Sequence, residues 1–94
     1  MATLKGTLTT GKIATWVVQP ARFSPDVATD AQFVLLRPVR GNTAWVSDAS
    51  CNSLDEARTL IHGKFPNAPM PALVEVAAGR MWKMTYYWRE PKYK

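Results

Sequence analysis

The 94-residue chain has a single cysteine and a single histidine, and this scarcity excludes several kinds of site. One cysteine cannot form a disulfide within the chain, and it is compatible with a reducing compartment. Zinc sites combine several cysteine and histidine ligands, so we expect no such metal site within one copy of the chain. Cys51 and His62 belong to opposite ends of a predicted helix, too far apart for a nucleophile–base pair. We therefore expect Cys51 to be a small buried residue.

Acidic residues are also few, with seven Asp and Glu against twelve Lys and Arg, for a formal net charge of +5. Asp26 and Asp30 share a loop, but two carboxylates without a third ligand make a weak ion site. The segment TLTTGK has the Gly-Lys ending of a phosphate loop, but it lacks the first Gly and the following Ser or Thr. The sequence thus predicts a protein that is not an enzyme and has no cofactor.

No hydrophobic run is long enough to span a bilayer, and the first residues, MATLKGTLTTGK, lack the apolar core of a secretory signal. We therefore expect a cytoplasmic protein with no membrane partner. With 47% hydrophobic and 20% charged residues, the composition is that of a folded protein. The length fits a single domain, residues 1–94, with one modest core.

The clearest local pattern is Asn52–Phe65, NSLDEARTLIHGKF, which carries both a helix start and a helix stop. Ser53 followed by Glu56 is a capping box, whose two side chains accept hydrogen bonds from backbone N–H groups. Gly63 is expected to end the helix in the left-handed conformation, and Pro66 prevents continuation. A helix this short needs a packing partner, and its apolar residues at helical spacing are Leu54, Ala57, Leu60 and Ile61.

Residues of the kind found in strands extend from Leu4 to Val18. Alternation in Leu4–Leu8 favours a first strand, and Ile13–Val18, which has few polar residues, favours a second. Thr10-Gly11 favours a turn, so we expect a hairpin at this end of the chain; one long bent strand is the alternative. Residues 19–31 are predicted to form a long loop, within which Phe23 is expected to fill the edge of the core; a contact residue is the alternative.

A second hairpin is predicted from Phe33–Val39 and Thr43–Val46, joined by a Gly41-Asn42 turn of the II′ kind. The first of these strands is apolar on both faces and is therefore expected inside the sheet. Pro38 cannot donate a ladder hydrogen bond, so the far end of that strand should lie at an edge or a bulge.

The last hairpin is predicted from Leu73–Ala77 and Met81–Trp88. Alternation places one set of side chains in the core, namely Trp82, Met84, Tyr86 and Trp88. The other set then faces outward, namely Lys83, Thr85, Tyr87 and Arg89. The chain is thus predicted to be α+β, an antiparallel sheet of four to six strands with one short helix packed on one face.

The C-terminal part is the most basic, because five Lys and Arg from Arg80 onward oppose only Glu90, and residues 89–94 are predicted to form a basic tail. The outward side of the last strand mixes aromatic and basic residues, which suits a protein interface or single-stranded nucleic acid. The candidate partner-binding residues are Arg80, Lys83, Tyr87, Arg89, Lys92 and Lys94.

Two functions fit this pattern. The first is a non-enzymatic binding protein whose partner is a protein or ribonucleoprotein complex with an acidic surface. The alternative is a small nucleic-acid-binding module that uses the basic, aromatic outer face of its last strand. A homodimer is compatible with either function. The positive charge is also compatible with a solvated tail that serves solubility and has no anionic partner.

From Gln32 to Trp88 the chain resembles, in architecture, the small inhibitors of host machinery that bacteriophages and mobile elements encode, including anti-CRISPR proteins. The features that carry this resemblance are the small size, one sheet–helix unit, and the helix start NSLDEA directly after a hairpin. The resemblance implies a viral protein that occludes a surface of a larger complex in the host cytoplasm. The positive charge departs from the acidic DNA mimics among such inhibitors.

Overall fold

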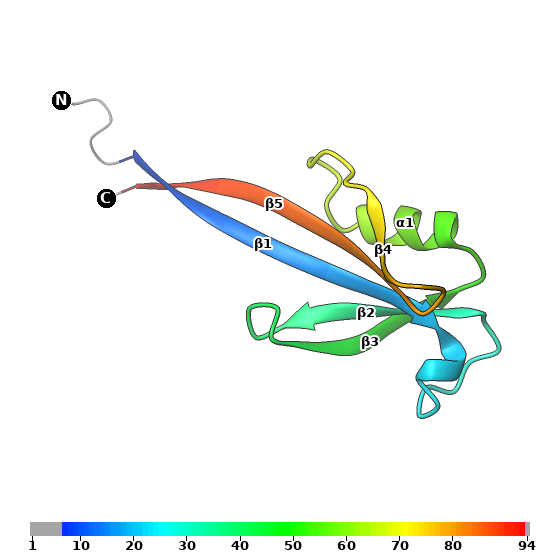
Figure 1. Cartoon of the computed structure of the whole chain (residues 1–94). Helices are drawn as coiled ribbons and strands as arrows, with labels where there is room; N and C mark the ends of the chain where they lie inside the picture. The colour runs from blue at the N-terminus through cyan, green and yellow to red at the C-terminus, as the bar shows by residue number, and fades with distance from the viewer. Residues whose placement is uncertain (1–6, 94) are drawn as a thin grey trace.

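The computed structural model describes residues 7–93, and it describes the side chains of residues 13–87. A five-stranded antiparallel sheet has the strand order β3-β2-β1-β5-β4, and one helix packs on one face of it (Figure 1). The predicted α+β fold is therefore confirmed. The elements are β1 (Thr7–Pro20), a short 3₁₀ helix (Ala21–Phe23), β2 (Phe33–Val39), β3 (Ala44–Cys51), α1 (Leu54–His62), β4 (Leu73–Ala77) and β5 (Met81–Tyr93).

The start of α1 is as predicted, but its end is not. The Ser53 hydroxyl accepts a hydrogen bond of 3.0 Å from the N–H of Glu56, and the Glu56 carboxylate accepts one of 2.9 Å from the N–H of Asn52. Gly63 has φ −59°, so the predicted left-handed conformation is wrong. The chain instead tightens after the helix, where the N–H of Lys64 donates to the carbonyl of Ile61. Such turns satisfy the last carbonyls without a positive φ.

The core lies between α1 and the face of the sheet that it covers. Its fully or nearly fully buried members come from four strands and the helix: Trp16, Val18, Leu35, Cys51, Ala57, Ile61, Met84 and Tyr86. The inward alternation predicted for the last strand is confirmed at Met84 and Tyr86, while Trp82 is half-buried against Phe33. The side chain of Trp88 lies outside the described part. Leu60 is 41% exposed, so the predicted apolar stripe of the helix is buried only in part.

The first strand is continuous, and the hairpin predicted at Thr10-Gly11 is wrong. β1 pairs with β5 without a register shift from Thr7 to Val18, with Gly11 opposite Arg89. The local tendency of Gly11 to turn is overridden because β5 supplies ladder partners along this whole length. For the same reason residues 89–93 belong to a strand and not to the predicted basic tail.

The β2–β3 hairpin has the predicted first strand, but its second strand and its turn differ from the prediction. β3 begins at Ala44 and continues to Cys51, five residues beyond the predicted end at Val46, because β2 supplies ladder partners as far as Phe33. Gly41 and Asn42 have φ of +66° and +70°, and two positive values are typical of a type I′ turn, not of the predicted II′ turn. Pro38 lies beyond Leu36, the last residue of β2 that pairs with β1. Its missing N–H therefore interrupts no ladder with β1, as the sequence predicts.

The loop predicted at residues 19–31 begins later, because Gln19 and Pro20 belong to β1 and pair with β2. It includes the 3₁₀ helix Ala21–Phe23 and a turn region up to Gln32. The Thr29 hydroxyl donates a 3.1 Å hydrogen bond to the Ser50 hydroxyl on β3, which ties the loop to the sheet. Phe23 is 42% exposed with the Arg22 guanidinium 4.7 Å from its ring centre, so its predicted place in the core is wrong. The edge of the core at this end is occupied by Phe33 and Trp82 instead.

The outer halves of β1 and β5 extend beyond the rest of the sheet as a two-stranded ribbon, residues 7–13 and 87–93 (Figure 1). β2 pairs with β1 only from Val17 to Pro20, and β4 pairs with β5 only as far as Met84. The molecule is consequently elongated, with extents of 57 × 23 × 21 Å. The remaining strands, the helix and the loop form a body at one end of this ribbon.

Candidate binding surface

The face of the sheet opposite α1, called here the open face, carries the outward residues of β5. Lys83 lies opposite Val17, Thr85 opposite Thr15, and Tyr87 opposite Ile13 in the β1–β5 register. Residues that are directly opposite in an antiparallel pair share a face. Lys83 also lies opposite Val74 of β4, so the open face continues to the edge of the sheet.

Four large apolar side chains of this face are exposed to solvent, and we call them the apolar strip: Ile13, Val74, Val76 and Tyr87. Tyr87 is 70% exposed, and the other three are close to half exposed. Val74 and Val76 line a groove of about 390 Å³ together with Lys83 and Thr85. Single exposed apolar residues are ordinary, but several on one face are typical of a contact surface.

Among the residues whose side chains the structure describes, Lys83 is the basic residue of β5 on this face. Its Nζ lies 5.7 Å from the ring centre of Trp45, close enough for a cation–π interaction. The Trp45 ring is fixed in turn, because its indole N–H donates a 2.8 Å hydrogen bond to the carbonyl of Thr15. Lys83 is therefore held against the sheet, and its charge lies beside the apolar strip.

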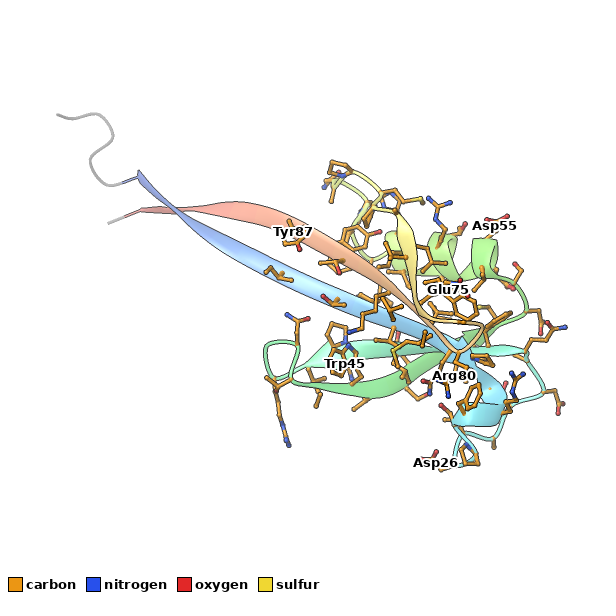
Figure 2. All side chains as sticks on the ribbon, in the orientation of Figure 1. Asp26, Trp45, Asp55, Glu75, Arg80 and Tyr87 are labelled. Atoms are coloured by element: carbon orange, nitrogen blue, oxygen red, sulfur yellow. The ribbon has the colours of Figure 1, made fainter. Side chains whose placement is uncertain are left out.

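The structure brings only some of the predicted partner-binding residues together. Lys83 and Tyr87 share the open face, whereas Arg80 is exposed in the β4–β5 turn at the far end of the strand (Figure 2). At about 3.4 Å per residue, Arg80 and Tyr87 are roughly 24 Å apart along β5. Arg89 and Lys92 lie in the ribbon, opposite Gly11 and Leu8, but their side chains are outside the described part. Lys94 lies beyond the described residues.

The chemically reactive residues are on the other side of the sheet. Cys51 is 2% exposed, which confirms the predicted burial, and its Sγ–H donates to the carbonyl of Ser53 at 3.4 Å. Burial raises the pKa of the Cys51 thiol, and the nearby Glu56 carboxylate adds to this, against the lowering effect of the backbone contact at Ser53. A raised pKa favours the unreactive thiol. Within the described residues, no group of three His, Cys, Asp or Glu is placed to hold a metal ion.

His62 forms a hydrogen bond with Tyr86 and not with Cys51. Its Nδ1 lies 2.9 Å from the Tyr86 hydroxyl, and the Phe65 ring stacks on Tyr86 with ring centres 4.3 Å apart. Burial raises the pKa of Tyr86, and the positive charge of Arg58 opposes this shift to a smaller degree. This cluster joins the end of α1 to β5, and its contacts are those of a core.

Sequence reasoning missed four residues of the open face: Ile13, Trp45, Val74 and Val76. The alternation in LVEVA could have identified the two valines, because Leu73 faces the core and the valines then face the other way. The role of Trp45 had no local signal, since its hydrogen-bond partner Thr15 is on a distant strand.

Among the described residues, no helix is long and apolar enough to cross a membrane. Comparison with known proteins adds no relative: no protein family matches the chain, and neither a curated protein nor a solved structure shows significant similarity to it.

Proposed function

We propose that the chain is a non-enzymatic binding protein whose open face covers a surface of a larger host protein or ribonucleoprotein complex, as in small phage-encoded inhibitors such as anti-CRISPR proteins. The observation that carries this proposal is the apolar strip, with Tyr87 70% exposed at the base of the ribbon. Tyr is enriched at protein interfaces because its ring supplies a large contact area with few rotatable bonds.

The balance of apolar and charged groups favours a protein partner over nucleic acid. Nucleic-acid binders obtain most of their affinity from several Lys and Arg residues that contact phosphates. In the described part of the open face the strip is uncharged, and Lys83 is already packed on Trp45. The net charge of +5 then favours a partner with an acidic surface.

The alternative is binding of single-stranded nucleic acid. The exposed ring of Tyr87 favours it, because aromatic side chains stack on bases, and the sequence places Arg89 and Lys92 a few residues further along β5. The two functions predict different responses to salt and to substitution of Tyr87.

Tagged protein can be used to capture its partner from a nuclease-treated bacterial lysate at physiological salt. We expect one protein or complex to be retained, and its retention to fall at least tenfold with Tyr87→Ala or Val74→Asp. Leu60→Ala is the matched control, because Leu60 is 41% exposed on the helix and not on the open face. Both face variants should stay folded, since Tyr87 is 70% exposed and Val74 is 53% exposed at the edge of the sheet.

Two results would refute the proposal. One is a captured partner whose retention is the same in Tyr87→Ala and Val74→Asp as in Leu60→Ala. The other is a complex with a single-stranded oligonucleotide that persists at physiological salt and weakens with Tyr87→Ala by about 1–3 kcal/mol, as base stacking requires.

A further inference from the structure

The hydrogen bonds at Thr15 show which way the backbone groups of β1 point. The N–H of Thr15 donates to Asn42 Oδ1 at 2.8 Å, and the carbonyl of Ile13 accepts from Asn42 Nδ2 at 3.0 Å. The carbonyl of Thr15 accepts from the Trp45 indole. Asn42 and Trp45 belong to the β2–β3 hairpin, so the backbone groups of Ile13 and Thr15 point away from β5.

The same direction can be assigned to residues nearer the tip of the ribbon. Backbone N–H and C=O groups alternate between the two edges of a strand with period two. β1 pairs with β5 from Thr7 to Val18 without a register shift. The backbone groups of Thr7, Thr9 and Gly11 therefore also point away from β5. No strand of the described residues pairs with them there, because β2 joins β1 only from Val17 onward.

The opposite edge of the ribbon is interrupted by a proline. Pro91 lies opposite Thr9, and Thr9 points away from β5, so this is a pair without direct hydrogen bonds. The ring nitrogen of Pro91 consequently lies on the outer edge of β5, where it removes a donor. Proteins commonly protect edge strands in this way, with proline, charge or a bulge.

The outer edge of β1 is protected over only part of its length. The Asn42 side chain hydrogen-bonds to the carbonyl of Ile13 and the N–H of Thr15, as the backbone of a neighbouring strand would. The segment Thr7–Gly11, TLTTG, contains neither a proline nor a charged residue. An isolated two-stranded ribbon is only marginally stable in water, and a third strand would stabilise it.

We propose that the edge of β1 at Thr7, Thr9 and Gly11 binds an extended acidic segment of a protein partner, which adds to the ribbon as a third strand. This inference rests on the proposed function in taking a protein as the partner. Backbone hydrogen bonds supply affinity in this mode of recognition, and flanking charges select the partner. The sequence of the ribbon has three basic residues, Lys12, Arg89 and Lys92, against Glu90. A second copy would carry the same positive excess and is therefore disfavoured.

The experiment uses a fluorescent peptide of alternating Glu and Val, with a peptide of alternating Lys and Val as the charge control. Binding to the full chain is measured by fluorescence anisotropy. Thr9→Pro removes an outward N–H without removing a donor from the ladder with β5, and Thr9→Ala keeps that N–H. We expect Thr9→Pro to weaken binding at least tenfold and Thr9→Ala less than twofold, with no comparable binding of the Lys peptide.

Amide hydrogen exchange of the unmodified chain gives a second test that does not depend on how the variant folds. Saturation with the Glu peptide should slow exchange at Thr9 and Gly11 by at least tenfold. Exchange at Thr10, whose N–H faces β5, should change much less. Unchanged exchange at Thr9 and Gly11 would overturn the proposal, as would equal binding to Thr9→Pro and Thr9→Ala.

Two further outcomes would assign the edge to another occupant and so overturn the proposal. One is a dimer in sedimentation that Thr9→Pro abolishes. The other is displacement of the Glu peptide by a single-stranded oligonucleotide. Leu60→Ala should leave peptide binding unchanged, because Leu60 is exposed on the helix and not on the ribbon. Peptide binding that depends on Thr9, together with capture that is indifferent to Tyr87, would support the edge and refute the proposed function.

Discussion

Tyr86 connects β5 to the helix, and two substitutions at this position separate the contribution of its hydroxyl from that of its ring. The side chain is 1% exposed, its hydroxyl lies 2.9 Å from His62 Nδ1, and its ring stacks on Phe65. Tyr86→Phe removes one hydrogen bond and should lower the free energy of unfolding by about 0.5–1.5 kcal/mol. Tyr86→Ala also removes the ring from the core and should cost about 3–5 kcal/mol. Since small domains are stable by only about 5–15 kcal/mol, the second variant should be close to unfolding.

The hydroxyl also predicts a dependence on pH. Burial raises the pKa of Tyr86, so the folded state holds this proton more tightly than the unfolded chain, whose tyrosine has a pKa near 10. The stabilisation is therefore complete below about pH 10 and is lost as the pH rises through the raised value. Tyr86→Phe should remove this part of the alkaline loss of stability.

Urea denaturation followed by tryptophan fluorescence, at neutral pH and above pH 10, measures both effects. Tyr87→Phe is the control, because Tyr87 is 70% exposed on the same strand and its change should stay within about 0.5 kcal/mol. If Tyr86→Ala cost less than 1 kcal/mol, the ring would not lie in the core. If Tyr86→Phe kept the full alkaline loss, the buried hydroxyl would not be its cause.

Two further substitutions test the helix cap at Ser53 and the hydrogen bonds between Asn42 and β1. Ser53→Ala should lower the free energy of unfolding by about 0.5–2 kcal/mol through loss of the helix cap, while Ser47→Ala, at an exposed strand position, should change it by less than about 0.5 kcal/mol in urea denaturation. Asn42→Gly keeps the positive φ but removes both hydrogen bonds to β1, so it should cost about 1–2 kcal/mol and accelerate amide exchange at Thr15. Unchanged exchange at Thr15 would show that the Asn42 side chain does not protect this edge.

The start of the helix was predictable because its determinants are neighbours in sequence. Ser53 and Glu56 need only each other and the first helical turn, and the structure has both hydrogen bonds. The end of the helix depends on how the following connector packs, and here the local preference of Gly63 did not decide the outcome. Local signals are reliable where the energy that they describe is itself local.

The hairpin predicted at Thr10-Gly11 is absent because the interactions that decide this part of the chain are not local. A Gly in a polar segment favours a turn when only neighbours are considered, but β5 offers hydrogen-bond partners to the whole of β1. Those partners are almost a chain length away, and no short window of sequence contains them. The contact between Trp45 and Thr15, which determines where Lys83 lies, also joins residues that no short window contains, because they are 30 residues apart.

The candidate surface was predictable where alternation alone decides it. Period two along the last strand placed Lys83 and Tyr87 on the face opposite Met84 and Tyr86, as the structure has them. Charge alone could not show that Arg80 lies at the far end of the strand. The functions assigned to these residues stay predictions until a partner is identified.

The central position of β1 determines when the sheet can be completed during synthesis. β1 is made first among the described strands, yet one of its two neighbours, β5, is made last. At about 5–20 residues per second, roughly 4–15 s separate the synthesis of β1 from that of β5, whereas a hairpin forms within about 1–10 μs. The newly made β1–β2–β3 unit must therefore keep an unpaired edge in the middle of the future sheet while α1 and β4 are synthesised. Chaperone binding or misassembly in the cell would act on this interior edge, which is covered in the finished protein.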